Sequence, residues 1–432
     1  MTGMKIRTIQ DLEAATYGGT FGNNQLLKAY GIASGVNTAI HSDSNAGAFS
    51  ANALYNLVYG QKVWSMLNRE INAFAMLPKK PWSSSGWRVM VERALGGTGD
   101  VLSITGGTGQ GSVTLDDIGG VAENASFTTG ATGELSPIAP KYETLFVSPK
   151  TIAHQFEISE LAAAMAKIDD GIGDIMAAYR EEVGVTHAEM MNHMLLTPLE
   201  SKSDGSGASV GAANLTSLYE IVTSKAELEA ADGGNLFAGA LPTAMKTLYG
   251  KDRTATANNG WMDSYIDDGD YAGSRRNLTL NLLNTALREL QIRGASPKVI
   301  LTGYDTIQAL GELLQSQERY MGRTEVMPSH NGIKGVKGRE IGFKVATYHD
   351  IPIIPCKEMG STGSGSGLSD IFILDTDHLH FATLKPTEYF EGGIDSGDPF
   401  GVGKLGNRGM YRTIGEVVCT FVKAQGKITN LS

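Results

Sequence analysis

Cysteine and long apolar runs are both scarce in this sequence of 432 residues. Its two cysteines, Cys356 and Cys419, cannot form a disulfide framework, so a reducing compartment is the simpler environment for the protein. The N-terminus lacks an apolar signal-peptide core, and no run approaches the roughly 18 apolar residues of a membrane span. We therefore predict a soluble protein that is made inside the cell and has no membrane partner.

Basic residues are also fewer than acidic ones. The chain has 36 Lys and Arg residues against 46 Asp and Glu residues, which gives a formal net charge of −10. Proteins that hold nucleic acid in a groove gain affinity when Lys and Arg displace counterions from phosphates. The acidic balance argues against such a groove, although it allows a protein that encloses nucleic acid without binding it tightly.

Complete catalytic motifs are missing, and the partial ones each lack an essential residue. The segment Gly107–Gly111 has glycines like those of a phosphate loop, but no Gly-Lys-Ser/Thr follows. His187-Ala-Glu189 and Pro355-Cys356 resemble halves of a zinc deaminase signature, yet Met359 stands where the second cysteine is required. We therefore expect no enzyme activity and no cofactor, and we assign no catalytic, cofactor-binding or metal-ligating residue.

Two groups of acidic residues each have two interpretations, an ordinary structural one and a metal-binding one. A turn after a strand is the preferred explanation of the first group, with a metal site as the alternative, and a solvated loop is the preferred explanation of the second, with a weak calcium site as the alternative. The first group is Asp375, Asp377, His378 and His380. The second group is Asp263, Asp267, Asp268 and Asp270.

Glycine is abundant, with 54 residues, and twelve of them fall between Trp82 and His154. Alternating residues predict strands at Trp87–Glu92 and Ile152–Ile158, near the two ends of this segment. The part between them has too little apolar surface to offset an ordering cost of about 1–2 kcal/mol per residue. We therefore predict an extended arm that completes its structure on neighbouring copies of the chain.

The rest of the chain has clearer periodicity. Apolar residues predict a helix within Phe49–Met76, a long helix from Asp174 to Leu196, and a short one within Leu218–Leu228. From Asn277 the pattern is that of an α/β domain. Its predicted elements are a helix through Leu280, Leu283, Leu287 and Leu290 that ends near Gly294, a strand at Val299–Thr302, a helix capped by Asp305 with Gln308, a strand at Phe343–Tyr348, an edge strand at Ile351–Pro355, and strands at Ile371–Leu374, Leu379–Leu384 and Met410–Val422.

The order of these parts resembles the major capsid proteins of tailed viruses, with the Hong Kong 97-like fold that encapsulins share. The resemblance covers roughly residues 80–430. It is carried by Ala139–Lys150 followed by Phe156–Glu160, Lys298–Thr302, Gly342–Tyr348 with Ile351–Ile354, Asp370–Asp377, and Leu384–Thr387.

The resemblance implies an α+β fold with named subdomains. We expect an N-terminal arm at 1–78, an E-loop in the form of an extended β-hairpin at 79–157, a P-domain at 158–276 with a spine helix at about 174–196, an A-domain at 277–383, and the returning strands of the P-domain at 384–432. Lys141, Lys150 and Asn124 lie in or near the arm, but no carboxylate is placed beside them. The resemblance therefore assigns no covalent cross-link.

The function implied is that of a non-catalytic major capsid protein, found in the virion and, during assembly, in the host cytoplasm. Copies would form the hexamers and pentamers of an icosahedral shell around double-stranded DNA, without sequence-specific binding. The chain begins at Met1 without a charged helical segment, so we expect a separate scaffolding protein, besides a portal and decoration proteins, as partners. The alternatives are an encapsulin-like nanocompartment and a cytosolic α/β enzyme with a long disordered insertion.

Overall fold

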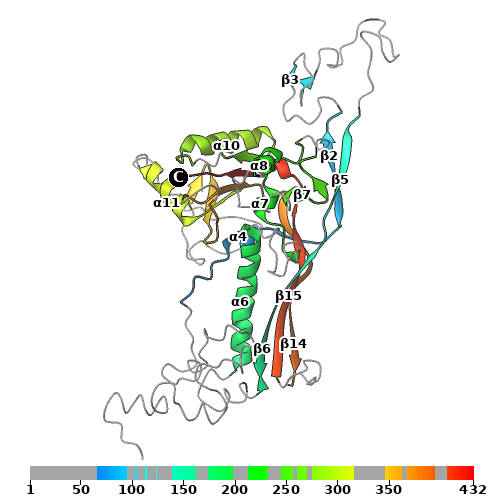
Figure 1. Cartoon of the computed structure of the whole chain (residues 1–432), viewed down its shortest axis with the longest axis vertical. Coiled ribbons are helices and arrows are strands. Elements are labelled where there is room, and N and C mark those ends of the chain that lie inside the picture. The colour runs from blue at the N-terminus through cyan, green and yellow to red at the C-terminus, as the bar shows by residue number, and fades with distance from the viewer. Residues whose placement is uncertain are drawn as a thin grey trace, which may run out of the picture. The chain divides into compact units, whose positions relative to one another are not determined.

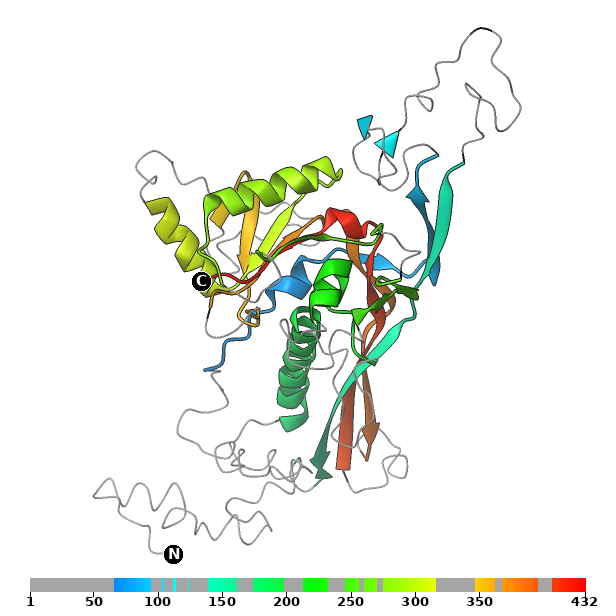
Figure 2. The same cartoon turned by 45° about the horizontal axis from the view of Figure 1, so that its top comes forward.

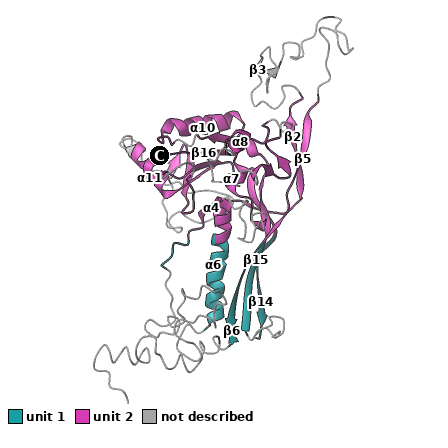
Figure 3. Ribbon diagram, viewed as in Figure 1, with its two compact units in different colours: residues 1–69, 152–189, 385–413 teal, residues 70–151, 190–384, 414–432 magenta. Residues whose placement is uncertain are grey.

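The computed structural model (Figure 1) divides the chain into two compact units, which Figure 3 shows in different colours. Unit 1 comprises residues 1–69, 152–189 and 385–413, and unit 2 comprises residues 70–151, 190–384 and 414–432. The structure describes residues 66–94, 103–104, 112–113, 123, 139–160, 163, 174–197, 213–231, 245–255, 260–269, 275–315, 346–361, 367–394 and 406–432.

The described helices range from a single turn to six turns. They are α4 (Asn72–Met76), α6 (Ile175–Leu196), α7 (Leu218–Ile221), α8 (Lys225–Ala231), α10 (Leu280–Ile292), α11 (Tyr304–Gln315) and the 3₁₀ helix η6 (Val422–Ala424). None of them is both long and apolar enough to cross a membrane.

The described strands belong to two larger sheets and three two-stranded pairs. They are β1 (Lys79–Pro81), β2 (Gly86–Glu92), β3 (Ser103–Ile104), β4 (Ser112–Val113), β5 (Lys141–Phe146), β6 (Lys150–Ser159), β7 (Thr247–Leu248), β8 (Lys251–Asp252), β9 (Tyr265–Asp267), β10 (Val299–Thr302), β11 (Ala346–Tyr348), β12 (Ile351–Pro355), β13 (Ile371–Leu374), β14 (Leu379–Gly393), β15 (Gly406–Cys419) and β16 (Gly426–Ile428).

A six-stranded sheet in the order β11-β12-β10-β13-β16-β9 forms the centre of unit 2. The strands predicted at Val299–Thr302 and Ile371–Leu374 are confirmed as β10 and β13, and both are fully buried. The prediction that Ile351–Pro355 lies at an edge is wrong, because β12 pairs with β11 on one side and β10 on the other. The sheet tolerates Pro355 because it ends the strand, and the N–H of Cys356 donates to the Thr302 carbonyl instead.

Helices cover both faces of this sheet, as the two views of the molecule show (Figures 1 and 2). Leu283, Ala286 and Leu290 of α10 pack in one cluster with Ile373 and Ile428 of the sheet. Residues that alternate with these along the strands face the other way. On that face, the ring of Phe372 meets Tyr219 of α7 edge to face, with 4.9 Å between centroids. The result is a three-layered core.

The C-terminal end of α10 was predicted correctly, whereas the start of α11 was not. Thr279 caps α10 by accepting the Leu282 N–H, and Gly294 follows its end with φ +84°, a conformation that glycine adopts without strain. The capping role predicted for Asp305 is wrong, because α11 already begins at Tyr304 and the Asp305 carboxylate accepts the Ser369 N–H.

Unit 1 contains parts of α6 and of the sheet β1-β14-β15-β6. The ring of Phe156 on β6 stacks between Tyr179 of α6 and Tyr389 of β14. Gly409 on β15 makes room for that stack, because a Cβ there would lie 2.6 Å from Phe156 Cε1. The helix predicted at Asp174–Leu196 is confirmed as α6.

Two other helix predictions are met only in part. Most of Phe49–Met76 lies outside the described residues, and in the described remainder only α4 is helical. The region Leu218–Leu228 contains two short helices, α7 and the start of α8, rather than one. Residues 343–345 of the predicted Phe343–Tyr348 strand also lie outside the described part, and its end is β11.

Candidate functional site

The strands β2 and β5 form an antiparallel ribbon with one face directed inward and one outward. Their register pairs Gly86 with Phe146 and Met90 with Tyr142. Side chains alternate between the faces of a strand, so each cross-strand pair belongs to a single face. The strand predicted at Trp87–Glu92 is thus confirmed as most of β2.

The inward face of the ribbon is held by the hairpin of β7 and β8. The ring of Trp87 packs edge to face on Tyr249, with 5.1 Å between centroids, and the Phe146 N–H donates to the Tyr249 carbonyl. Lys251 Nζ donates to Glu143 Oε2 at 2.8 Å, and this contact lowers the pKa of Glu143. These contacts fix the orientation of the ribbon within unit 2.

The outward face of the ribbon carries large apolar side chains that remain in solvent. The exposed fractions are 59% for Met90, 61% for Tyr142 and 62% for Phe146, and Arg88 on the same face is exposed too. Isolated apolar residues on a surface are ordinary, whereas neighbouring exposed apolar residues make a surface a candidate interaction site. Met90 and Tyr142 are such neighbours because they face each other across the ladder.

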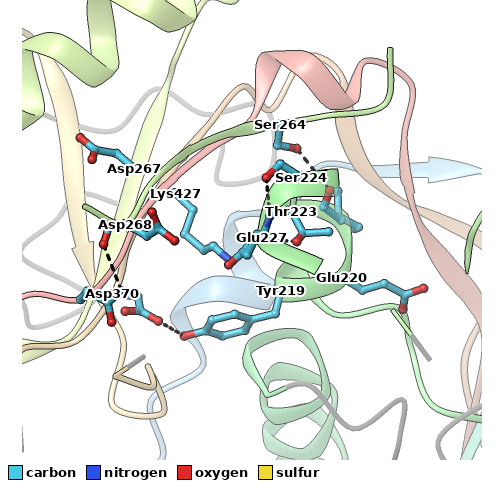
Figure 4. Close-up of polar contacts among 12 residues, drawn as sticks. Tyr219, Glu220, Thr223, Ser224, Glu227, Ser264, Asp267, Asp268, Asp370 and Lys427 are labelled. Carbon is cyan, nitrogen blue, oxygen red and sulfur yellow. Dashed lines mark hydrogen bonds and ion pairs between the residues drawn. The ribbon is translucent and has the colours of Figure 1, made fainter. Parts of the chain in front are cut away.

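A buried ion pair and its polar partners connect α7 and α8 to the central sheet (Figure 4). Lys427 Nζ of β16 donates to Glu227 Oε1 of α8 at 2.7 Å, and the side chains are 1% and 2% exposed. Thr223 Oγ1 donates to the other carboxylate oxygen at 2.6 Å. The Lys427 ammonium also lies 5.3 Å from the centre of the Tyr219 ring. Alternation along β16 explains this direction, because Ile428 faces the α10 side.

The hydroxyl of Tyr219 extends this network to the strand β13. It donates to Asp370 Oδ2 at 2.9 Å, and burial together with that carboxylate raises the pKa of Tyr219 well above its ordinary value. Thr302 Oγ1 donates in turn to the Asp370 carbonyl. The polar groups are thus used to join elements of the protein, which indicates a structural role.

The first acidic group from the sequence forms a turn, as its ordinary interpretation predicted. Asp375 accepts the N–H groups of Ser296 and Asp377, between β13 and β14. Asp377 pairs with Lys298 at 2.6 Å. His380 lies on β14, where burial lowers its pKa to about 4.

Two carboxylates of the second acidic group, those of Asp263 and Asp267, have different partners. Asp263 accepts the Lys225 N–H, and burial raises its pKa, while Asp267 pairs with Arg276. Asp270 lies outside the described residues. Within the part of the chain that the structure describes, no three His, Cys, Asp or Glu side chains are grouped so as to hold a metal ion.

The remaining partial motifs are either packed into the protein or not described. His187 is buried in α6, where it contacts His154 and Thr413. Cys356 is buried at the end of β12, and burial raises the pKa of its thiol above its ordinary range. The segment Gly107–Gly111 and Asn124 lie outside the described residues.

Sequence reasoning did not single out the exposed residues of the ribbon. The alternation in Trp87–Glu92 shows that one face is apolar but not which neighbours cover it. The covering residue, Tyr249, lies in a part of the sequence that composition describes only as loop.

Comparison with known proteins adds a family match. The sequence matches the family described as "SU10 major capsid protein" over residues 150–401, which is more than half of the chain. This match begins at β6 and therefore follows the ribbon in the sequence. No curated protein sequence matches the chain.

Solved structures give weaker similarities. A capsid protein in "Cyanophage A-1(L) capsid asymmetric unit" has a TM-score of 0.49 at 13% identity, covering 87% of this chain and 97% of that one. The subunit of the holo-SrpI encapsulin complex from Synechococcus elongatus PCC 7942 has a TM-score of 0.44 at 10% identity, covering 89% and 96%. Both scores lie below 0.5, so the family match alone supports the conclusions that follow.

Proposed function

We propose that this chain, which belongs to the SU10 major capsid protein family, binds a second copy of itself in the capsid through the outward face of the β2–β5 ribbon. Membership makes it a major capsid protein, a structural and non-catalytic component of a tailed-phage-like icosahedral shell in the virion. The observation that carries the proposal is the row of exposed apolar side chains on a ribbon whose other face is fixed.

The partner on this face is a second copy because a shell is built from repeated contacts between identical chains. Burying the part of Met90, Tyr142 and Phe146 that is still exposed would contribute about 1–2 kcal/mol for each side chain. The inward contacts of Trp87 already order the ribbon, so little conformational entropy is lost on binding. A modest energy in each contact is sufficient, since it recurs throughout a closed shell.

The proposal also includes the subdomains of the Hong Kong 97-like fold. The ribbon would be the base of the E-loop (79–157), and α6 the spine helix of the P-domain (158–276, with return strands at 384–432). The strands β10, β11, β12 and β13 of the six-stranded sheet would be the core of the A-domain (277–383), while β9 and β16 of that sheet come from the ranges given to the P-domain. The long helix α6, the three-layered α/β core and the strands β14 and β15 support this assignment. The N-terminal arm at 1–78 lies largely outside the described residues.

The assembled shell would consist of pentamers and hexamers around double-stranded DNA. The net charge of −10 supports an interior that does not bind phosphates tightly. A scaffolding protein supplied as a separate chain, a portal and decoration proteins complete the set of partners. Analysis of native particles tests the contents: double-stranded DNA supports this proposal, and a protein cargo would favour the encapsulin alternative.

The ribbon contact is tested by placing a charge on its outward face. The full chain carrying both Met90→Glu and Tyr142→Glu, co-expressed with its scaffolding protein, should stay folded but fail to form shells in electron microscopy and sedimentation. The control is Ile292→Glu on α10, an apolar residue that is 45% exposed, and it should assemble normally. Normal assembly of the ribbon variant would refute the ribbon contact, whereas failure of the unaltered chain to assemble under any condition would refute the capsid function.

A further inference from the structure

Two histidines of unit 1, one half-buried and one buried, make direct contact. Nδ1 of His154, on β6, lies 2.7 Å from Nδ1 of His187, on α6. Their rings meet edge to face at 4.9 Å, and His187 is only 1% exposed. The helix is therefore joined to the sheet by a contact between two groups that can each take up a proton.

A chain of hydrogen bonds continues from this pair across the sheet. His187 Nε2 lies 2.7 Å from Thr413 Oγ1 of β15, which lies 2.8 Å from Thr387 Oγ1 of β14. His154, His187, Thr413 and Thr387 thus connect four elements of unit 1 in one line. Because hydroxyls both donate and accept, the line can run in either direction with every contact satisfied.

The distance between the two Nδ1 atoms sets a limit on the number of protons. One nitrogen must carry a proton and the other must accept it, since two N–H groups cannot face each other at 2.7 Å. A single added proton can reside on the far nitrogen of His154 without disturbing the contact. A second added proton would place a donor on both Nδ1 atoms of His154 and His187, and the contact must then open.

The charged side chains on the surrounding elements are paired with one another. The pairs are Arg180 of α6 with Glu391 of β14, Arg408 of β15 with Glu157 of β6, and Arg412 of β15 with Glu388 of β14. Tyr411 of β15 stacks on His187 at 6.1 Å between ring centroids and donates its hydroxyl to the Arg180 carbonyl. No described carboxylate contacts either imidazole to stabilise a doubly charged pair.

We propose that His154 and His187 form an acid-sensitive latch that holds α6 against the β6, β14 and β15 strands and releases it when both imidazoles are protonated. The latch acts inside one subunit and is independent of the proposed ribbon contact. Its release would loosen unit 1 without any change at the β2–β5 ribbon.

The pH window follows from the environment of the pair. Burial lowers the pKa of His154, and burial followed by the charge of His154 lowers the pKa of His187 to about 4. The ordinary pKa of histidine is near 6.5, so the open state binds more protons than the closed state between about pH 6.5 and 4. The closed contact is therefore fully favoured above about pH 6.5. The equilibrium constant for forming the closed contact falls by up to roughly tenfold for each pH unit below that. Over the whole window for His187 the fall amounts to roughly 300-fold.

Hydrogen exchange of the full chain tests the latch. Protection of residues 152–159 and 175–189, corrected for the intrinsic rate at each pH, should fall steeply between pH 7 and 4.5, while α10 changes much less. The variant His154→Gln with His187→Gln cannot titrate at these positions and should lose protection at least tenfold less over the same range. His193→Gln, a change of another histidine on α6, should behave like the unaltered chain.

Direct titration of the histidines, observed by NMR with labelled histidine, gives a second measurement that needs no stable double variant. His187 should titrate more than one pH unit below 6.5. The proposal is refuted if His187 titrates near 6.5, if protection of these segments does not respond to pH, or if the double variant loses protection as the unaltered chain does. The contributions of carboxylates cancel in the comparison because they are common to all variants.

Discussion

Replacing Lys427 by Met should destabilise the folded chain strongly, although it removes only one charge. The substitution leaves the Glu227 carboxylate, whose side chain is 2% exposed, with the Thr223 hydroxyl but without its ammonium partner. Water cannot replace that partner, because the site lies between α8 and the central sheet.

The magnitude follows from what remains buried. Removing one member of a buried ion pair costs about 3–5 kcal/mol, because the other charge is left uncompensated. Replacing both members, as in Lys427→Met with Glu227→Leu, removes the two charges together and should cost far less, or even stabilise the fold by about 1–4 kcal/mol. A domain has only about 5–15 kcal/mol of stability, so the single variant should show a large shift in its unfolding midpoint.

Urea denaturation of the unassembled chain, followed by circular dichroism, measures these differences. The control is Lys225→Met on α8, where Lys225 and Glu229 form an exposed pair at 3.7 Å that contributes little. The reasoning is refuted if Lys427→Met costs less than about 1 kcal/mol, or if the double variant is less stable than the single one.

Three further predictions concern buried groups. Burial raises the pKa of Glu416 to about 7, above its unfolded value near 4.5, so its contribution to stability is present at low pH and lost as pH rises through about 4.5–7. Glu416→Gln should therefore raise stability at pH 8 by roughly 1–3 kcal/mol relative to the unaltered chain, with little gain at pH 4, in urea titrations. Gly409→Ala should cost about 1–3 kcal/mol because its Cβ would overlap Phe156. The control Gly311→Ala on α11, where an added Cβ has nothing within 4 Å, should carry no such cost, and equal unfolding midpoints for the two variants would contradict this. Cys356 and Cys419 should resist iodoacetamide until the chain unfolds, since burial raises the pKa of both thiols; rapid labelling of the native protein, detected by mass spectrometry, would contradict it.

Helices and buried strands were the features most accessible from sequence. The leucines of α10 recur at helical spacing, and Gly294 follows the helix end, so local pattern and local chemistry agree. Asp305 was misjudged because its partner, the Ser369 N–H, is distant in sequence. The strand Ile351–Pro355 was wrongly placed at an edge because prolines lack an N–H for the sheet. Pro355 is tolerated because it ends the strand and the next residue, Cys356, supplies the hydrogen bond.

The candidate surface could be predicted only in part. Alternation along β2 indicates that its two faces differ, but Met90 and Val91 are both apolar, and the pattern does not say which one is buried. The answer depends on Trp87, whose ring packs on Tyr249, because that contact determines which alternate residues of β2 face inward. A register shift of one residue would exchange the two faces, so this distant contact determines which side chains form the surface that we propose as a subunit contact.

The abundance of glycine has a second cause besides loops. Gly409 and Gly415 lie in the middle of β15, where glycine normally weakens a strand. An added Cβ would come within 2.6 Å of the Phe156 ring at the first position and of the Phe381 ring at the second. Each glycine therefore lets an aromatic ring from elsewhere in the chain lie across β15, and its entropic cost is offset by the apolar area that the ring buries. From composition alone such glycines would be taken to indicate a flexible backbone, whereas their neighbours in the structure show that they permit close packing.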